Sequence, residues 1–297
     1  MTISGFVAIT GQPNVGKSTL LNGFLGEKLA IVTEKPETTR DNIKGIYTDE
    51  DAQIIFTDTP GIHRPHDLLG KVMLTRAESS ILECDIVLFV TEAGIAFNSD
   101  DMRIVEKLPD AGTGKKVLMV INKVDKVRDK KLLLPLIDKA TGIYPFAEIV
   151  PMCALKDKDL GHLVKTIKKY LPEGPFLYPE DELTDKDNRF CIQEIIREKT
   201  LLFTYEEIPH SVAVVVDEIV PSEGKKPVKV FATIFVERAS QKSILVGKEG
   251  AMIKKIGQTA RKEIGSLISS RVHLDLWVKV KEKWKKDPNS LRELGYS

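Results

Sequence analysis

The stretch GQPNVGKS, residues Gly11–Ser18, decides the fold of the N-terminal part of this 297-residue chain. It directly follows an apolar run, Phe6–Thr10, and opens a stretch with helical spacing. A phosphate-binding loop needs this strand–loop–helix context, because its glycines let backbone N–H groups turn toward a phosphate and the helix adds its positive dipole. Lys17 can reach the β- and γ-phosphates of a nucleotide, and the Ser18 hydroxyl can bind Mg²⁺. The nucleotide-contacting residues expected here are Gly11, Gln12, Pro13, Asn14, Val15, Gly16, Lys17, Ser18 and Thr19.

Outward from this loop, short apolar runs alternate with helical patterns as far as about Leu171. The further runs, rich in Val, Ile and Phe, are Gln53–Thr57, Asp85–Val90, Lys116–Asn122 and Ala147–Met152. Apolar residues recur every three or four positions in Leu69–Leu82, Asp100–Leu108 and Leu160–Leu171. Continuously apolar runs are typical of strands buried on both faces. Their alternation with helices predicts an α/β domain with a mainly parallel sheet and helices on both faces.

A second motif, DTPG at Asp58–Gly61, follows the run Gln53–Thr57. Ligands of open α/β sheets bind at the carboxyl ends of strands, so this location selects Asp58 over a second Asp-x-x-Gly match at Asp67–Gly70. We expect Asp58 to hold Mg²⁺ through water and the Gly61 N–H to bond the γ-phosphate. The nucleotide-contacting residues expected here are Asp58, Thr59, Pro60, Gly61 and Ile62.

A third motif, NKVD at Asn122–Asp125, follows the run that ends at Asn122 and predicts the base. The Asp125 carboxylate can accept hydrogen bonds from guanine N1–H and N2–H₂, whereas adenine offers neither donor and would leave the carboxylate unpaired. We expect Asn122 to brace the neighbouring loop and the base, and the stem of Lys123 to lie over the ring. The third motif therefore predicts a guanine nucleotide.

Cys153, Ala154 and Leu155 follow the fifth apolar run and form a weaker motif. The Ala154 N–H could bond guanine O6. With the three stronger motifs in this order, each at the C-terminal end of a strand, the N-terminal domain is predicted to be a translation-factor-like GTPase.

The stretch PETTR, Pro36–Arg40, falls where the mobile first switch of such a GTPase should lie. Thr38 or Thr39 could bind Mg²⁺ only when a γ-phosphate is present, and Thr39 is the prediction. The expected metal ligands are therefore Ser18, Thr39 and Asp58. Ile62 occupies the place of the glutamine that orients the attacking water in Ras-like enzymes, so we expect slow intrinsic hydrolysis of GTP. The residues expected to assist hydrolysis are Lys17, Thr39, Gly61 and Asn14.

The stretch LPEGPFLYPED, Leu171–Asp181, interrupts the alternation, and its three prolines and one glycine cannot continue a helix. We expect the GTPase domain at residues 1–173, a linker at 174–182 and a second domain at 183–297. From Arg238 to Ser297 the chain carries 14 Lys/Arg against 6 Asp/Glu, whereas the rest carries 30 against 37. This asymmetry fits a polyanionic partner for the second domain, or a solvated, lysine-rich surface.

The second domain has a different order of elements. A helix is expected over Lys186–Phe203, strands over Ser211–Val220 and Lys229–Val236, a glycine-interrupted helical segment over Ser243–Ser269 and a strand over Val272–Val280. GKEG, Gly247–Gly250, is then a Gly-x-x-Gly loop between two helices, the core of a KH domain that clamps four single-stranded nucleotides. The order of elements predicts an α+β type II KH fold, and the alternative is a plain α+β domain with a helix–turn–helix corner.

Apolar and basic residues surround this loop. The residues expected to contact RNA are Ile244, Val246, Gly247, Lys248, Glu249, Gly250, Ile253, Lys254 and Lys283. The stretch Trp277–Lys286 adds basic charge with two tryptophans, which suits RNA through phosphate neutralisation and stacking. Trp277 lies in an expected strand and fits a place in the core equally well.

Other features of the sequence argue against a membrane-spanning, a secreted or a metal-binding protein of the cysteine type. No run of about 18 apolar residues occurs, and the start MTISGFVAIT lacks the pattern of a secretory signal. Cys84, Cys153 and Cys191 have no metal-type spacing, so we expect free, buried thiols in a reducing cytoplasm. We interpret His63 and His66, in the expected second switch, as surface residues rather than metal ligands.

With the phosphate loop, PETTR, DTPG, NKVD and CAL in one domain and Gly247–Gly250 in the next, the whole chain resembles the Era family of bacterial ribosome-associated GTPases. The resemblance implies binding of GTP, GDP and Mg²⁺, contact of the KH domain with the 3′ end of 16S rRNA, and a role in maturation of the small (30S) ribosomal subunit. It also implies a cytoplasmic monomer with peripheral contact at the cytoplasmic face of the inner membrane. In related GTPases an Asn at the place of Asn14 can bind K⁺, which is a hypothesis here. Cys153 departs from the Ser usual in the family, which changes little because the adjacent Ala154 N–H makes the base contact.

Three rival functions stay open on the sequence. The phosphate loop could serve a phosphoryl-transfer enzyme, although Asn122–Asp125 argues against it. The chain could be an RNA-binding module that uses nucleotide only for structure, an alternative that Ile62 leaves open. The basic end could bind an acidic membrane or a protein instead of RNA.

Overall fold

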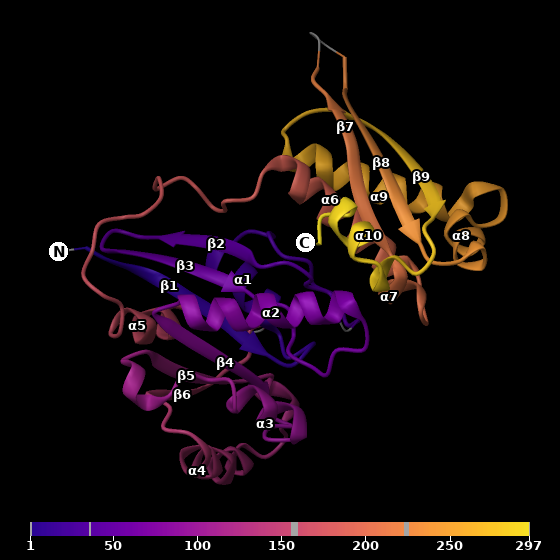
Figure 1. The fold of residues 1–297 in the computed structure, drawn as a ribbon. Coiled ribbons are helices and arrows are strands. Elements are labelled where there is room, and N and C mark those ends of the chain that lie inside the picture. The colour runs from indigo at the N-terminus through magenta and orange to yellow at the C-terminus, as the bar shows by residue number, and fades with distance from the viewer. Residues whose placement is uncertain (1, 36, 156–159, 223–225, 297) are drawn as a thin grey trace. The chain divides into compact units, whose positions relative to one another are not determined.

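The computed structural model describes residues 2–35, 37–155, 160–222 and 226–296. They form two compact units: the first comprises residues up to 65 together with 73–185, and the second comprises 66–72 together with the residues from 186 onward. Figure 1 shows the elements of both units. The stretch 174–182, expected as a linker, lies within the first unit. Pro36, the first residue of the PETTR motif, lies outside the described residues.

The first unit contains a six-stranded sheet in the order β2-β3-β1-β4-β5-β6. Its strands are β1 (Ile3–Gly11), β2 (Ile43–Thr48), β3 (Ala52–Asp58), β4 (Ile86–Glu92), β5 (Lys116–Asn122) and β6 (Glu148–Pro151). All neighbouring pairs are parallel except the antiparallel pair β2–β3, so the prediction of a mainly parallel sheet is confirmed. Strands β3, β4 and β5 are buried along nearly their whole length, as strands covered on both faces should be.

Helices cover both faces of this sheet. They are α1 (Lys17–Leu25), α2 (Leu68–Glu83), α3 (Ser99–Val105), α4 (Leu133–Ile143) and α5 (Gly161–Lys168), with short 3₁₀ turns η1 (Ala111–Thr113), η2 (Val124–Lys126) and η3 (Lys130–Leu132). Residues of α2, α3 and α4 share one core cluster with Ala8 and Phe89. Phe56 pairs with Val7, the neighbour of Ala8, so it points to the opposite face. There Phe24 of α1 stacks on it with ring centroids 4.2 Å apart.

The second unit contains a three-stranded sheet in the order β7-β8-β9. Its elements are α6 (Asn188–Phe203), α7 (Ile208–Ser211), β7 (Ala213–Val220), β8 (Val228–Val236), α8 (Ala239–Val246), η4 (Lys248–Gly250), α9 (Ala251–Leu267), β9 (Val272–Val280), η5 (Trp284–Lys286) and α10 (Pro288–Glu293). Strand β8 pairs antiparallel with β7 and parallel with β9. This order confirms the predicted KH fold.

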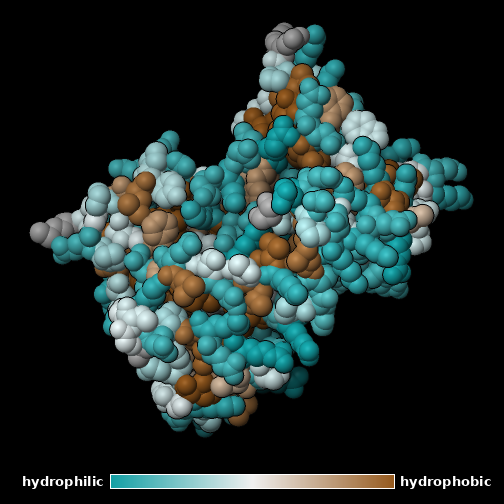
Figure 2. Space-filling view, viewed as in Figure 1, coloured by the Kyte–Doolittle hydropathy of each residue, from teal (hydrophilic) through white to brown (hydrophobic). Residues whose placement is uncertain are grey.

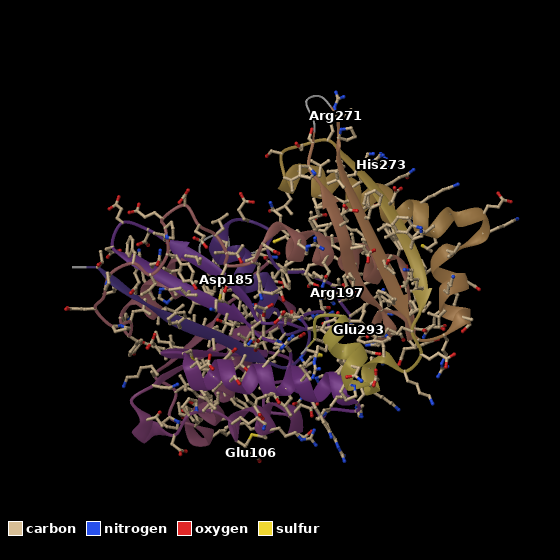
Figure 3. The ribbon with its side chains drawn as sticks, turned by 45° about the horizontal axis from the view of Figure 1, so that its top comes forward. Glu106, Asp185, Arg197, Arg271, His273 and Glu293 are labelled. Carbon is tan, nitrogen blue, oxygen red and sulfur yellow. The ribbon has the colours of Figure 1, made fainter. Side chains whose placement is uncertain are left out.

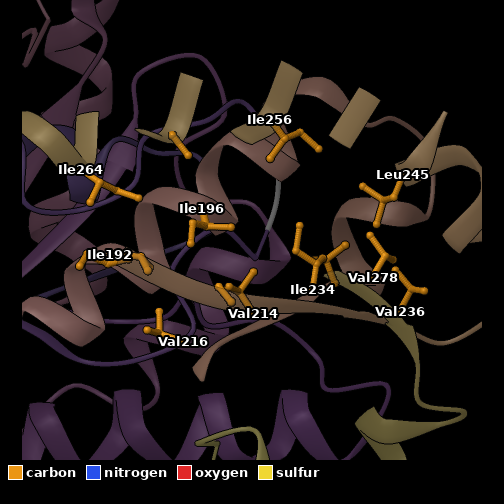
Figure 4. Packing of buried hydrophobic residues seen from close by; sticks show 14 of the residues in the cluster. Ile192, Ile196, Val214, Val216, Ile234, Val236, Leu245, Ile256, Ile264 and Val278 are labelled. Atoms are coloured by element: carbon orange, nitrogen blue, oxygen red, sulfur yellow. The ribbon is translucent and has the colours of Figure 1, made fainter. Parts of the chain in front are cut away.

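The core of the second unit lies between its sheet and three helices. Figure 4 shows Ile196 of α6, Leu245 of α8 and Ile256 of α9 packed against residues of the strands, such as Val214 and Ile234. All five side chains are fully or almost fully buried. One face of the sheet is therefore closed by helices.

The structure also bears on the expected absence of a membrane span and on the three cysteines. In the described parts of the chain, no helix combines the length and the apolar character needed to cross a bilayer. All three cysteines are free, with Cys84 and Cys153 buried and Cys191 half-buried. Burial raises the pKa of the Cys84 thiol to about 11, which keeps it protonated and unreactive at neutral pH.

Candidate nucleotide site and nucleic-acid clamp

One cavity of about 530 Å³ in the first unit collects residues from all the nucleotide-binding motifs. Its walls include Pro13, Asn14, Gly16, Lys17, Ser18, Thr19, Thr38, Thr39, Gly61, Asn122, Lys123, Asp125, Cys153, Ala154 and Leu155. Other expected contacts, namely Gly11, Gln12, Val15, Asp58, Thr59, Pro60 and Ile62, are not among the lining residues. Several of these, including Val15, Asp58 and Ile62, are buried behind the wall, so they support the site from within.

The phosphate loop takes a conformation that needs glycine. Gly16 has a φ of 104°, and a Cβ there would lie 2.2 Å from Asn122 Nδ2. Lys17 Nζ donates to the carbonyl oxygens of Gly11 (3.1 Å) and Gln12 (2.8 Å). Burial lowers the pKa of Lys17 to about 8, because the ammonium group has lost most of its water. The loop thus holds a buried cation, for which a phosphate would be a natural counter-charge.

Three oxygen donors meet beside Lys17. Ser18 Oγ donates to Asp58 Oδ2 at 2.6 Å, Thr39 Oγ1 donates to the same oxygen at 3.1 Å, and the two hydroxyl oxygens are 3.0 Å apart. Asp58 is fully buried, and desolvation raises the pKa of its carboxyl group. Among the described residues, its Oδ1 atom has no hydrogen-bond partner. Two hydroxyls and a carboxylate with a free buried oxygen fit a hard cation such as Mg²⁺.

The two threonines of the first switch point to different partners. Thr38 Oγ1 donates to the Lys35 carbonyl oxygen at 2.6 Å, whereas Thr39 faces Asp58. Because Thr38 is occupied within its own loop, the geometry favours Thr39 as the switch residue that can reach a metal.

The second switch follows Gly61. Ile62 is almost fully buried and joins the core cluster of α2, α3 and α4, so its side chain offers no polar atom to a water molecule. His63, expected on the surface, is only 21% exposed and connects the two switches: Nδ1 lies 2.9 Å from the Gly61 carbonyl oxygen and Nε2 lies 3.3 Å from Glu37 Oε1. The hydrogen bond to Glu37 raises the pKa of His63.

Asn122 and Lys123 connect the end of the cavity that carries the NKVD motif to the phosphate loop. Asn122 Nδ2 donates to the Val15 carbonyl oxygen at 2.8 Å, and its Oδ1 accepts from the Ala154 N–H at 3.0 Å. That N–H was expected to face guanine O6. Lys123 Nζ donates to the Asn14 carbonyl oxygen at 2.6 Å. Asp125, on the turn η2, lines the same cavity and is exposed to solvent.

In the second unit, the Gly-x-x-Gly loop connects α8 to α9. Gly247 and Gly250 have φ angles of 72° and 77°, and a Cβ on Gly247 would lie 2.9 Å from the Met252 backbone nitrogen. Ile244, on α8, is 52% exposed. The expected RNA residues Lys248, Glu249 and Lys254 are exposed, whereas Val246 and Ile253 are half-buried. The loop therefore presents backbone and cations to solvent, as a phosphate clamp should.

A groove of about 250 Å³ lies next to this loop, between α9 and β9. Its lining residues are Ile253, Lys254, Gly257, Gln258, Arg261, Leu274 and Leu276. Of these, Ile253 and Lys254 were predicted RNA contacts, and the other five were not predicted from the sequence. Helical spacing from Ile253 could have found Gly257 and Arg261, which lie four and eight positions further on. Lys283, the residue before η5, is not part of this lining.

Comparison with known proteins finds relatives of both parts of the chain. A family described as 50S ribosome-binding GTPase matches residues 6–123, and a KH domain family matches residues 207–285. GTPase Era of Syntrophus aciditrophicus (strain SB) is 48% identical over 294 residues, which cover 99% of this chain and 95% of that protein. Two solved structures match 100% of both chains at 43% identity: a point variant of Aquifex aeolicus Era bound to GDP·AlF4⁻ (TM-score 0.95), and Era with MgGDPNP and nucleotides 1506–1542 of 16S ribosomal RNA (TM-score 0.96).

Proposed function

Since this chain belongs to the Era family of GTPases, we propose that it is a GTP-driven switch that binds the 3′ region of small-subunit rRNA. It binds GTP and GDP with Mg²⁺ and hydrolyses GTP to GDP and phosphate. The observation that carries the RNA part of the proposal is the presence, in one chain, of a nucleotide cavity and a Gly-x-x-Gly loop with an adjoining groove.

The chain's own residues divide the work of the nucleotide site. Lys17, the backbone N–H groups of the phosphate loop and the N-terminus of α1 would hold the phosphates. Ser18, Thr39 and Asp58 would hold Mg²⁺, which supplies positive charge to the β- and γ-phosphates when bound. Thr39 and Gly61 lie on opposite switches at the cavity, so a γ-phosphate between them would order both segments.

Hydrolysis without a partner should be slow. Ile62 cannot orient a water molecule, because its side chain is apolar and packed in the core. We include K⁺ in the proposal as a second source of positive charge, bound at Asn14. The Asn14 Nδ2 donates to the carbonyl oxygen of Glu34 at 2.8 Å, just before the first switch. Faster turnover in K⁺ than in Na⁺ buffer, lost on Asn14→Ala, is the expected result, and equal rates in the two buffers would remove K⁺ from the account.

The second unit would hold the RNA. The Gly247–Gly250 loop would clamp the backbone of about four nucleotides. Bases would then enter the groove between α9 and β9, where Gln258 and Arg261 offer hydrogen-bonding groups. The Era relative crystallised with nucleotides 1506–1542 of 16S rRNA supports the 3′ end of that RNA as the ligand.

The cellular role follows from this ligand. We propose that the chain assists maturation of the small (30S) subunit as a cytoplasmic monomer, with peripheral contact at the inner membrane. We further propose that residues 174–182 connect the GTPase and KH domains. The Era relatives and the basic C-terminal end support this assignment.

One experiment tests partner and nucleotide coupling together. The protein is crosslinked to total cellular RNA with GTP or with GDP present, and the bound RNA is sequenced. We expect reads concentrated at the 3′ end of 16S rRNA, in different amounts with the two nucleotides, and loss of these reads when Gly247 and Gly250 are both changed to Asp. Reads spread evenly over cellular RNA, unchanged in that variant, would refute the RNA assignment.

A further inference from the structure

The two tryptophans of the C-terminal stretch have opposite environments. Trp284 is fully buried, its Nε1–H donates to the Ser211 carbonyl oxygen at 2.9 Å, and its ring stacks on Tyr296. Trp277 is 48% exposed. Of the two places that the sequence allowed for Trp277, core or surface, the structure gives the surface. A half-exposed tryptophan on a strand needs an explanation, because burying so large an apolar ring is strongly favourable.

Trp277 lies on the face of the β7-β8-β9 sheet opposite the helices. Leu274, Leu276 and Val278 pack into the core with α9, so the alternating residues of β9 point the other way. Figure 2, seen as in Figure 1 with α9 behind the strands, shows hydrophobic side chains among hydrophilic ones over this part of the sheet. The surface formed by Phe231, Trp277 and Lys279 is called the outer patch below.

The outer patch contains an aromatic pair. The Trp277 and Phe231 rings are 6.0 Å apart between centroids and 25° from parallel. Phe231 is half-buried, so it supports the tryptophan from the neighbouring strand and leaves the indole partly open. A supported indole face is the kind of platform on which single-stranded bases stack, whatever their sequence.

Charges at both ends of the patch suit a phosphate backbone. Lys279 follows Trp277 on the same face of β9, is exposed, and has no ion-pair partner within the described residues. At the other end, Arg271 directly precedes β9 and His273 is its second residue; both are labelled in Figure 3. Carboxylates are also present. Asp275 lies 3.4 Å from His273, and Asp217 accepts from the Thr233 hydroxyl at 2.8 Å. The exposed Glu218 lies opposite Phe231 in the strand register and has no ion-pair partner among the described residues, so it opposes phosphate binding at that end of the patch.

The outer patch is continuous with the RNA groove. Strand β9 is at the edge of the sheet, so no further strand lies beside it to block the path from one face of the sheet to the other. Leu274 and Leu276 line the groove on the inner face, and Trp277 is the next residue, on the outer face. A single strand that leaves the groove can therefore cross this edge and reach the indole within a few nucleotides.

We propose that the outer patch is a second RNA contact, where a base beyond the clamped nucleotides stacks on Trp277 and a flanking phosphate pairs with Lys279. The inference rests on the proposed RNA-binding function of the groove. A protein partner would be a different proposal, and the supported aromatic face next to an RNA groove favours RNA.

Tryptophan fluorescence gives a direct test, because the chain has two tryptophans and Trp284 is buried. Two RNAs from the 3′ end of 16S rRNA are compared, one of four nucleotides and one of about a dozen. We expect the longer RNA to quench the native protein and to shield it from acrylamide, and the four-nucleotide RNA to do neither. Trp277→Phe should lose the response. Full binding of the longer RNA with no change in Trp277 emission or shielding would overturn the proposal.

Affinity provides the second measurement. Trp277→Ala should weaken binding of the longer RNA by about 5- to 150-fold, as expected for one lost stacked base, and leave binding of the four-nucleotide RNA unchanged. Trp277→Phe should keep most of the affinity, and Tyr205→Ala, at a 73% exposed tyrosine in the same unit, should keep all of it. Lys279→Ala should reduce the salt dependence of binding by about one phosphate contact.

The outcomes separate this inference from the function on which it rests. Loss of both RNAs in Gly250→Asp with no effect of Trp277→Ala or Lys279→Ala would leave the groove as the RNA site and reject the outer patch. Failure of the native protein to bind either RNA would reject the proposed function itself. Thermal unfolding and GTP binding of each variant show whether it is folded. If Trp277→Ala does not fold, the RNA affinity of Lys279→Ala, a change at an exposed residue, tests the outer patch instead.

Discussion

Asn122 and Val15, 107 residues apart in the chain, are joined by a buried hydrogen bond of 2.8 Å from the Asn122 side-chain amide to the Val15 carbonyl oxygen. The oxygen of the same amide accepts from the Ala154 N–H. One side chain therefore sets the spacing between the phosphate loop and the loop that carries Ala154. In the proposed site, this frame would hold the two ends of the nucleotide at a fixed distance.

Asn122→Ala should break this frame. It leaves the buried Val15 carbonyl unpaired, which costs about 1–3 kcal/mol, and removes the partner of the half-buried Ala154 N–H, so we expect lower stability and weaker binding of GTP and GDP alike. Asn122→Asp keeps the acceptor for Ala154 and loses the donor to Val15, so it separates the two bonds. Chemical denaturation and nucleotide titration measure both effects. Unchanged nucleotide affinity in a folded Asn122→Ala protein would show that the frame is unimportant.

Gly16→Ala should abolish nucleotide binding. The added methyl group would lie 2.2 Å from Asn122 Nδ2, so the phosphate loop or the amide would have to move. Gly26→Ala is a matched control, because Gly26 also has a positive φ, of 67°, but a Cβ there has no atom within 4 Å. Both variants carry backbone strain, and only the first adds the clash. Equal nucleotide affinity in the two variants would refute the steric argument.

Thr39→Ala and Thr38→Ala separate the two threonines of the first switch. Thr39 donates to Asp58 and Thr38 donates to the Lys35 carbonyl oxygen. We expect Thr39→Ala to slow Mg²⁺-dependent GTP hydrolysis by about tenfold or more, as for loss of one group that stabilises transition-state charge, and to spare GDP binding. Thr38→Ala should stay close to the native rate. The reverse order of the two rates would move the metal ligand to Thr38.

Gln53→Ala should loosen the stretch 174–182. This fully buried side chain accepts from the N–H groups of Leu177 and Tyr178, at 2.7 and 2.9 Å, and donates to the Tyr178 carbonyl oxygen at 2.9 Å. We expect a loss of about 2–3 kcal/mol of stability and faster proteolysis near Tyr178. Gln53→Glu keeps both accepting contacts, so its stability and its cleavage rate should lie between those of the native protein and Gln53→Ala. Equal cleavage rates in all three would contradict this role.

The sequence was most informative where function and burial impose strong constraints. The motif Gly11–Ser18 allowed one local structure, and runs such as Lys116–Asn122 are apolar throughout because both sheet faces are covered. The edge strand β2 was missed because Ile43–Thr48 mixes Lys44, Tyr47 and Thr48 with apolar residues and is only partly buried. Helix α4 was missed because Leu133–Ile143 contains Pro135 and Gly142.

Contacts between distant residues lay beyond sequence reasoning. Nothing local indicates that Gln53 would bind the backbone at Tyr178, or that His63 would meet Glu37. The two tryptophans show the same limit, because Trp277 and Trp284 share one basic stretch, yet one is open and the other is in the core. Side-chain environment depends on which elements pack together, and local spacing does not carry that information.

Recognition of the purine by Asp125 is the central claim, and nucleotide competition against Asp125→Asn tests it most directly. The native protein should bind GTP at least about a hundredfold more tightly than ATP, because adenine leaves the carboxylate unpaired. Asp125→Asn should lose affinity for GTP and gain affinity for xanthosine triphosphate. Asp129→Asn, at the nearby cap of η3, should bind nucleotides as the native protein does. Equal binding of ATP and GTP by the native protein, or an unchanged preference for GTP over xanthosine triphosphate in Asp125→Asn, would contradict the account.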